Sequence, residues 1–179
     1  EAAGNMSDII RPGSGNERRF ALPDTVALEG DKLVIIDQTE LPRRLKLLRL
    51  SESAEIFEAI KSLRVRGAPA IGVAAAIGLY LAAHGWLTRE PDMTAQTLLG
   101  HISEEKKYLA SSRPTAVNLF WALDRMCARA QSLSHESPRD IVCGMRAEAE
   151  LIRDEDIASC RRIAENGLAL LRPHSGILT

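Results

Sequence analysis

The stretch VRGAPAIGVAAAIGLYLAAHGWL, residues 65–87, decides the fold of this chain. From Gly67 to Leu87 it has no formally charged side chain and is dominated by alanine and glycine. Pro69 suits the first turn of a helix, because its fixed backbone angle is already helical and its missing N–H is not needed there. A run of this length can span a membrane. Small residues pack closely inside a protein, however, and a helix that is apolar all round is typical of a core, so we predict a buried central helix.

Helical patterns flank this segment on both sides. Upstream, Ser51 or Ser53 is suited to cap a helix, and apolar residues at helical spacing predict its buried face: Ile56, Phe57, Ile60 and Leu63. Downstream, we predict a helix over 94–109, a helix opened by Pro114 and a helix capped within 137–140. The buried faces of the last two are expected to hold Val117, Phe120, Leu123, Cys127 and Ala130, and then Ile141, Met145, Ala149 and Ile152. A sixth helix is expected over 157–166, with Gly167 as a left-handed stop.

Three short segments before the helices predict a small antiparallel sheet. Residues 26–28, 33–36 and 44–50 are apolar or alternate basic residues with leucine, and turn-forming residues separate them. The expected fold class is therefore α+β, with an N-terminal β-meander followed by a helical bundle. A further strand is expected to open at 177–179, and it suggests a βαβ-type sheet that begins there.

Composition divides the chain into three expected parts. Residues 1–24 are rich in glycine, proline, serine and charge, and they predict a flexible arm. Residues 25–171 hold the predicted meander and helices, and the chain is long enough for them to form one domain with a real core. Residues 172–179 are expected to begin a C-terminal domain that this chain largely lacks.

Charge and cysteine usage exclude several classes of protein. Lys and Arg number 23 against 24 Asp and Glu, and aromatic residues make up only 4% of the chain, so a general nucleic-acid binder is disfavoured. The three cysteines, Cys127, Cys143 and Cys160, form no C-x-x-C pair, and the histidines are scattered. A disulfide framework and a structural metal are therefore not expected, and a reducing cytoplasm is the predicted location.

Two segments share a design that suits an anion. Arg66 precedes the proline-initiated central helix, and Arg113 precedes Pro114 in the same way. A helix N-terminus offers unpaired N–H groups and partial positive charge, and a guanidinium adds a two-pronged donor for phosphate. Gly67 allows close approach of an anion to the backbone. These features predict a phosphate cradle; the alternative is ordinary helix capping and close helix packing. Asp37, at the end of a predicted strand, is suited to cap or orient a loop.

Three segments resemble one enzyme family. Residues 60–78, IKSLRVRGAPAIGVAAAIG, and residues 112–123, SRPTAVNLFWAL, closely resemble two motifs of the methylthioribose-1-phosphate isomerases. Residues 33–42, LVIIDQTELP, fit the family's opening strand and turn. Regulatory subunits of the translation-initiation nucleotide-exchange factor and archaeal ribose-1,5-bisphosphate isomerases are related to this family in fold.

The resemblance implies a specific reaction and a partial site. The activity would be aldose–ketose isomerisation of 5-methylthioribose 1-phosphate to 5-methylthioribulose 1-phosphate in methionine salvage, without a cofactor and in a cytoplasmic homodimer. The second domain would be Rossmann-like. Substrate-binding residues carried over from the family are Arg66, Gly67, Ala68 and Arg113.

The resemblance assigns no catalytic residue to this chain. The family's catalytic cysteine and aspartate are expected beyond Thr179, and none of the three cysteines present matches, so the fragment alone should be inactive. One alternative is a non-catalytic sugar-phosphate-binding or regulatory relative of the same fold. Another is a purely structural helical domain.

Overall fold

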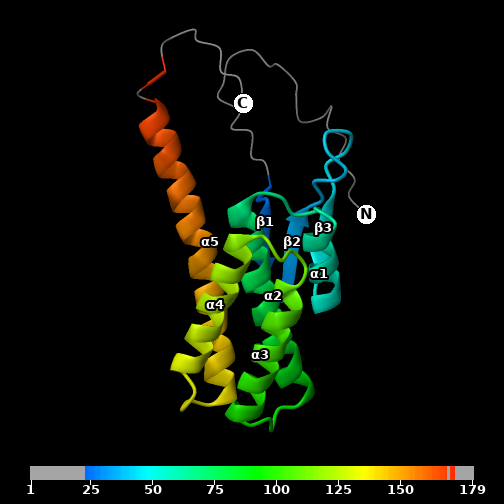
Figure 1. The fold of residues 1–179 in the computed structure, drawn as a ribbon, viewed down its shortest axis with the longest axis vertical. Coiled ribbons are helices and arrows are strands. Elements are labelled where there is room, and N and C mark those ends of the chain that lie inside the picture. The colour runs from blue at the N-terminus through cyan, green and yellow to red at the C-terminus, as the bar shows by residue number, and fades with distance from the viewer. Residues whose placement is uncertain (1–22, 169, 172–179) are drawn as a thin grey trace.

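A computed structural model describes residues 23–168 and 170–171, and these form a small sheet beside a helical bundle (Figure 1). The sheet contains β1 (Val26–Glu29), β2 (Lys32–Ile36) and β3 (Leu47–Leu50), paired antiparallel in the order β1-β2-β3. The predicted meander is confirmed. Its third strand is shorter than expected, because the chain before Leu47 is held in a turn in which the Arg44 N–H donates to the Glu40 carbonyl.

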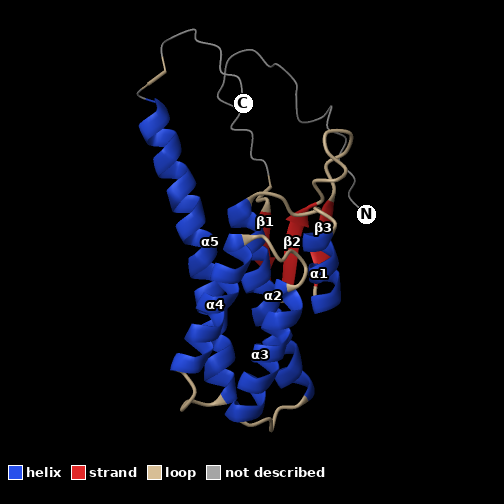
Figure 2. Ribbon diagram, viewed as in Figure 1, coloured by secondary structure: helices blue, strands red, loops and turns tan. Residues whose placement is uncertain are grey.

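The described helices are arranged around one central member. They are α1 (Ser53–Lys61), α2 (Ala68–Arg89), α3 (Ala95–Ala110), α4 (Val117–Ser132) and α5 (Pro138–Leu168). The chain runs in alternating directions through the last four, so α2 and α4 both begin at the end of the bundle that carries the sheet (Figures 1 and 2). The α+β class predicted from the sequence is the observed one.

Helix α2 is the buried centre of the fold, as predicted. It packs against α1, α3, α4, α5 and the strands β1 and β2. It is long and apolar enough to cross a membrane by length and composition, but 67% of its most apolar window is buried inside the protein. Gly72 lets α4 approach closely: a Cβ added there would lie 2.8 Å from the backbone oxygen of Asn118. Small residues in α2 therefore serve helix packing, as expected of a core helix.

The start of α1 and the residues after its end differ from the prediction. Glu52, not Ser51 or Ser53, is the N-cap, because the Glu55 carboxylate accepts hydrogen bonds from the N–H groups of Ser51 and Glu52. Of the predicted inward face, Ile56 and Ile60 are fully buried and Phe57 packs against the core, but Leu63 is 40% exposed. Leu63 lies beyond the helix end, in a left-handed conformation.

The prediction for α4 was partly wrong. The helix begins at Val117 and not at Pro114, because a turn closed by the Ala116 N–H on the Arg113 carbonyl precedes it. Val117 and Phe120 are exposed, and the buried face is rotated toward α2 through Leu119, Ala122, Leu123, Met126 and Ala130. The close contact with Gly72 explains the rotation, since it brings the side of α4 that carries Asn118 and Ala122 onto α2.

Helix α5 joins two elements that were predicted separately. It continues from Pro138 to Leu168, so the expected break before 157 is wrong. The acidic run 154–156 contains neither glycine nor proline, and Glu155 is paired with Arg125 of α4, which favours continuation of the helix. Gly167 lies inside α5 and does not have a positive φ, so it is not a stop. The predicted inward residues Ile141, Met145, Ala149 and Ile152 are buried as expected, and Thr94 caps α3.

Two predictions lie almost wholly outside the described residues. The expected flexible arm covers 1–24, of which the structure describes only Pro23 and Asp24. The expected start of a C-terminal domain, with its strand at 177–179, lies at positions the structure does not describe.

Candidate functional site

The loop that enters α2 begins with a tight turn at the end of α1. The Arg64 N–H donates to the Ala59 carbonyl at 2.9 Å, and the Leu63 N–H donates to the Ile60 carbonyl at 3.3 Å. These are the two hydrogen bonds of a Schellman motif, in which glycine usually occupies the left-handed position. Here that position is Leu63, with φ of 64°. The turn redirects the chain toward the start of α2 within a few residues.

Gly67 occupies the N-cap position of α2 and leaves the start of the helix open. Its φ of 91° and ψ of 131° are angles that favour glycine, and its carbonyl accepts the first helical hydrogen bond, from the Ile71 N–H at 3.0 Å. Among the described residues no side chain caps this helix, and Gly67, Ala68 and Pro69 are all exposed. The start of α2 is therefore exposed, and the partial positive charge of a helix start favours an anion there.

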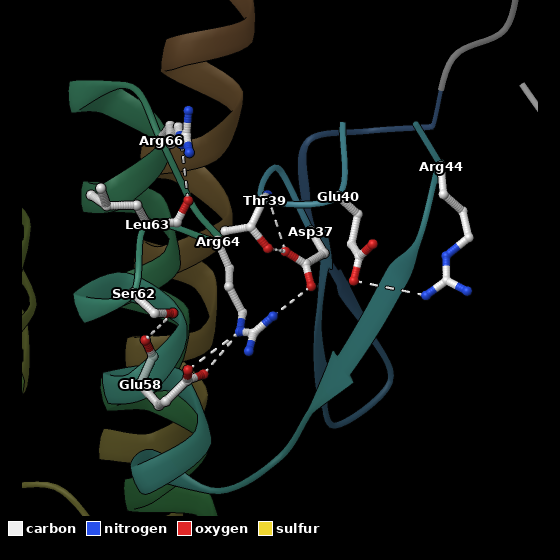
Figure 3. Close-up of polar contacts among 9 residues, drawn as sticks. All are labelled: Asp37, Thr39, Glu40, Arg44, Glu58, Ser62, Leu63, Arg64 and Arg66. Carbon is white, nitrogen blue, oxygen red and sulfur yellow. Dashed lines mark hydrogen bonds and ion pairs between the residues drawn. The ribbon is translucent and has the colours of Figure 1, made fainter. Parts of the chain in front are cut away.

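Arg64 and Arg66 lie two residues apart but have different environments. The Arg64 guanidinium donates to the Asp37 carboxylate at 2.6 Å and to the Glu58 carboxylate at 3.0 Å. Arg66 is exposed, and its Nε donates to the Leu63 carbonyl at 3.1 Å. Figure 3 shows the Arg66 guanidinium apart from the cluster around Asp37. Within the described residues Arg66 forms no ion pair, so its terminal nitrogens are available to a ligand.

Asp37 anchors the loop to the end of β2. Its side chain is fully buried, and its carboxylate accepts hydrogen bonds from the Thr39 N–H at 3.1 Å, the Thr39 hydroxyl at 2.6 Å and Arg64. Burial alone would raise the pKa of Asp37, but the hydrogen bonds from Thr39 and the pairing with Arg64 outweigh it and lower the pKa. The carboxylate is therefore ionised at neutral pH, and Arg64 is neutralised by it.

A second helix start lies beside the first. Arg113 is partly buried at the entry to α4, and its neighbour Ser112 is buried, with its hydroxyl donating to the Leu109 carbonyl at 2.6 Å. No side chain caps α4, and Arg113 forms no ion pair with any residue in the described ranges. Because Gly72 in the second turn of α2 packs against Asn118 in the first turn of α4, the two helix starts are neighbours.

The structure therefore gathers all four predicted substrate-binding residues at one end of the bundle. Arg66, Gly67 and Ala68 form the start of α2, and Arg113 precedes the start of α4 (Figure 1). The acids closest to this loop, Asp37 and Glu58, are occupied by Arg64. Each helix start, with an arginine that forms no ion pair among the described residues, has the chemistry that suits an anion such as a phosphate monoester.

The three cysteines lie on α4 and α5, and none is in the loop that enters α2 or in the turn before α4. Cys127 is half-buried between α3 and α4, and burial raises the pKa of its thiol. Cys143 lines a cavity of about 580 Å³ where the end of α2 meets the start of α5, at the other end of the bundle. Cys160 is exposed on α5. Across the ranges that the structure describes, no three His, Cys, Asp or Glu side chains converge as metal ligands.

A family comparison identifies the chain. The model of the initiation factor 2 subunit family matches residues 64–179, which include both helix starts. The chain belongs to the initiation factor 2 subunit family.

Relatives in this family carry the names of sugar-phosphate isomerases. The chain is 50% identical over 158 residues to the methylthioribose-1-phosphate isomerase of Symbiobacterium thermophilum, covering 87% of this chain and 43% of that protein. It is 48% identical over 149 residues to the 5-deoxyribose 1-phosphate isomerase of Petrotoga mobilis, covering 83% of this chain and 42% of that protein. The chain thus spans less than half the length of these relatives.

Solved structures of the family share the fold. The 5-methylthioribose 1-phosphate isomerase of Pyrococcus horikoshii matches with a TM-score of 0.70 and 38% identity, over 75% of this chain and 37% of that one. The delta subunit of translation initiation factor eIF-2B from A. fulgidus matches with a TM-score of 0.74 and 36% identity, over 84% of this chain and 42% of that one. The α+β architecture is therefore a family property.

Sequence reasoning missed the residues that hold the loop. It did not assign a partner to Asp37, and it did not distinguish Arg64, which is neutralised, from Arg66, which is free to bind. Gln38 was also missed: its N–H donates to the Arg64 carbonyl at 3.0 Å and its side-chain amide lies 3.5 Å from the Arg66 carbonyl. The one available signal was the position of Asp37 at the end of a strand.

Proposed function

We propose that this chain forms the phosphate-binding part of an aldose–ketose isomerase that converts 5-methylthioribose 1-phosphate to 5-methylthioribulose 1-phosphate in methionine salvage. The observation that carries the proposal is the open start of α2, where Arg66 forms no ion pair with any described residue while Arg64, two positions before it, is neutralised. The substrate-binding groups are Arg66, the backbone of Gly67 and Ala68, and Arg113. The names and similarity of the isomerase relatives support the reaction class.

The chemistry explains why a rigid anion site is useful. In this reaction C2 of the sugar is oxidised from a carbinol to a ketone while C1 is reduced, so hydrogen moves within the substrate and no outside oxidant is needed. The phosphate on C1 prevents ordinary opening of the ring, so the substrate has to be held while protons or a hydride move between C1 and C2. Arginines and helix N–H groups that are already in place hold the dianion without reorganising during the reaction.

The described part of the chain is assigned to binding and not to proton transfer. None of the three cysteines matches the catalytic cysteine that the family resemblance implies, and Cys143 lies at the far end of the bundle, so we assign none of them a catalytic role. General acid–base groups are expected elsewhere in the complete enzyme. We also expect that enzyme to be a homodimer that uses no cofactor.

A second candidate is a regulatory relative that binds a sugar phosphate without turnover. The similarity to the eIF-2B delta subunit, at 36% identity, favours this alternative. Both candidates require the same anion site, and they differ in whether the ligand is converted.

Turnover distinguishes the two candidates. The protein that continues this chain to the length of its relatives is incubated with 5-methylthioribose 1-phosphate or 5-deoxyribose 1-phosphate, and conversion is followed by phosphorus NMR. We expect the first sugar to be converted to its ketose, and Arg66→Ala and Arg113→Ala each to lower kcat/KM about tenfold or more, since a charge-assisted phosphate contact is worth ~1.5–3 kcal/mol. Arg49→Ala is the control, because Arg49 is exposed and paired with Glu29 on the sheet. Binding without conversion would support the regulatory candidate, and unchanged kinetics in both arginine variants would refute the cradle.

A further inference from the structure

We propose that Asp37 is a positioning residue for the anion site, acting through Arg64 on the loop 64–67. This inference rests on the proposed function and deepens it, because it names the group that fixes the geometry of the phosphate-binding loop. Asp37 does not face the open start of α2. Its carboxylate is fully buried and points to Thr39 and Arg64 (Figure 3).

A buried carboxylate is expensive unless it is fully paired, so its place in the fold needs a reason. Asp37 immediately follows β2, and the residue next to it, Gln38, donates its N–H to the Arg64 carbonyl. The Arg64 guanidinium returns to Asp37 across 2.6 Å. These two contacts hold the backbone and the side chain of Arg64, and they fix its position relative to the sheet.

The fixed Arg64 determines the course of the next residues. Val65 is 1% exposed and anchors the loop in the core, whereas Arg66 and Gly67 are exposed. The side chains on either side of Val65 therefore have separate roles, with Arg64 directed to Asp37 and Arg66 available to a ligand. The Arg66 Nε is steadied by the Leu63 carbonyl, which belongs to the same turn. Movement of Arg64 would displace both the guanidinium of Arg66 and the N–H groups at the start of α2.

Removal of the Asp37 charge distinguishes a positioning role from a simple electrostatic effect, because the two predict opposite changes in the affinity for an anion. Asp37→Asn removes a negative charge near the loop and leaves Arg64 paired with Glu58 alone, so an electrostatic effect alone would tighten anion binding. If Asp37 acts by positioning, the variant binds an anion more weakly, because displaced donors bind less well; in catalysis a misplacement of about 1 Å can cost ~100-fold in rate. We expect a smaller shift of the loop and a rise in Kd of about tenfold.

The test measures binding of inorganic phosphate to the 179-residue chain at constant pH and ionic strength by amide NMR titration. The unaltered chain is expected to show its phosphate-induced shifts at Gly67, Ala68 and Ala70. Asp37→Asn should raise Kd about tenfold. The matched control is Glu40→Gln, three positions along the chain, whose side chain is 38% exposed and whose carboxylate pairs with Arg44 at 3.8 Å. This control should leave Kd unchanged.

A second pair of variants keeps the test valid if Asp37→Asn does not fold. Thr39→Val removes the hydroxyl that donates to Asp37 at 2.6 Å, and Thr39→Ser retains it. We expect Thr39→Val to weaken phosphate binding and Thr39→Ser to restore it. A role confined to stability would lower the urea midpoint in Thr39→Val without changing Kd.

The outcomes distinguish this inference from the proposed function. If Arg66→Gln weakens phosphate binding but Asp37→Asn and Thr39→Val leave it unchanged or tighten it, positioning by Asp37 is refuted and the anion site stands. If the unaltered chain shows no shifts at the start of α2, or Arg66→Gln binds phosphate as well as the unaltered chain, the anion site itself is refuted and this inference falls with it.

Discussion

Substitution of Gly67 by alanine tests whether the site needs the backbone conformation that Gly67 adopts at the start of α2. A Cβ built at Gly30, Gly67 or Gly100 would meet nothing within 4 Å, so steric clashes do not contribute at these positions. They differ in backbone conformation. Gly67 has φ of 91° and ψ of 131°, Gly30 has φ of 59° in the turn between β1 and β2, and Gly100 lies inside α3. The effect of a methyl group at each position therefore reports the backbone alone.

The expected changes in the free energy of unfolding differ in sign. Alanine at Gly67 enters a region that is sparsely populated by other residues, so we expect a loss of about 2 kcal/mol. Alanine at Gly30 enters the left-handed helical region, which costs ~1–2 kcal/mol, partly offset by the reduced entropy of the unfolded chain. Alanine at Gly100 should instead stabilise the protein by ~0.5–1 kcal/mol, because a helix interior favours alanine over glycine.

Urea unfolding followed by circular dichroism measures these changes from the midpoint and slope of each transition. The predicted order of stability is Gly100→Ala above the unaltered chain, which is above Gly30→Ala and then Gly67→Ala. Gly67→Ala should also weaken phosphate binding, since the loop cannot keep its course. A Gly67→Ala variant as stable as the unaltered chain would show that the left-handed conformation at the start of α2 is not required, and the reasoning would be refuted.

Three further predictions concern packing and buried charge. Gly72→Ala should lower stability by ~1–3 kcal/mol in urea unfolding, because its methyl group would meet the Asn118 backbone oxygen, whereas Gly85→Ala, whose Cβ would have only the far end of Arg89 at 3.8 Å, should not. The pKa of Asp37 is lowered on folding, so its carboxylate stabilises the folded protein above its ordinary pKa of 3.8. The stability advantage over Asp37→Asn should be full at pH 6 and disappear as the pH falls below 3.8, and an advantage that persists at lower pH would contradict this assignment. Burial raises the pKa of Glu105, and one of its carboxylate oxygens is buried with no hydrogen-bond partner among the described residues, so its charge destabilises the fold above its ordinary pKa of 4.5. Glu105→Gln should raise the urea midpoint at pH 7 and lose this gain as the pH falls to 4.5, and a lower midpoint at pH 7 would refute the assignment.

Features determined by local sequence were predictable. Alanine-rich composition with Pro69 at the first turn indicated α2, the pattern over 94–109 indicated α3, and alternation with turn residues indicated the meander. The two arginines before helix starts were also recognisable, because each lies close in sequence to a proline that suits the start of a helix. The structure then placed those helix starts side by side, which no local pattern could show.

Features determined by tertiary contacts were missed. Leu63 continued the apolar spacing of α1, yet the Schellman turn places it in a left-handed conformation in which glycine is usually found. The buried face of α4 is set by its contact with Gly72 and not by its own periodicity. Arg64 and Arg66 look alike in sequence, and only the folded position of Asp37 shows which one is neutralised.

The most direct test of the central claim is a crystal structure of the complete protein with 5-methylthioribose 1-phosphate bound. We predict that the phosphate lies at the start of α2, with its oxygens within about 2.7–3.2 Å of backbone N–H groups at Gly67, Ala68 or Ala70 and of the guanidinium groups of Arg66 and Arg113. A phosphate bound elsewhere, such as in the cavity beside Arg139 at the opposite end of the bundle, would contradict the assignment.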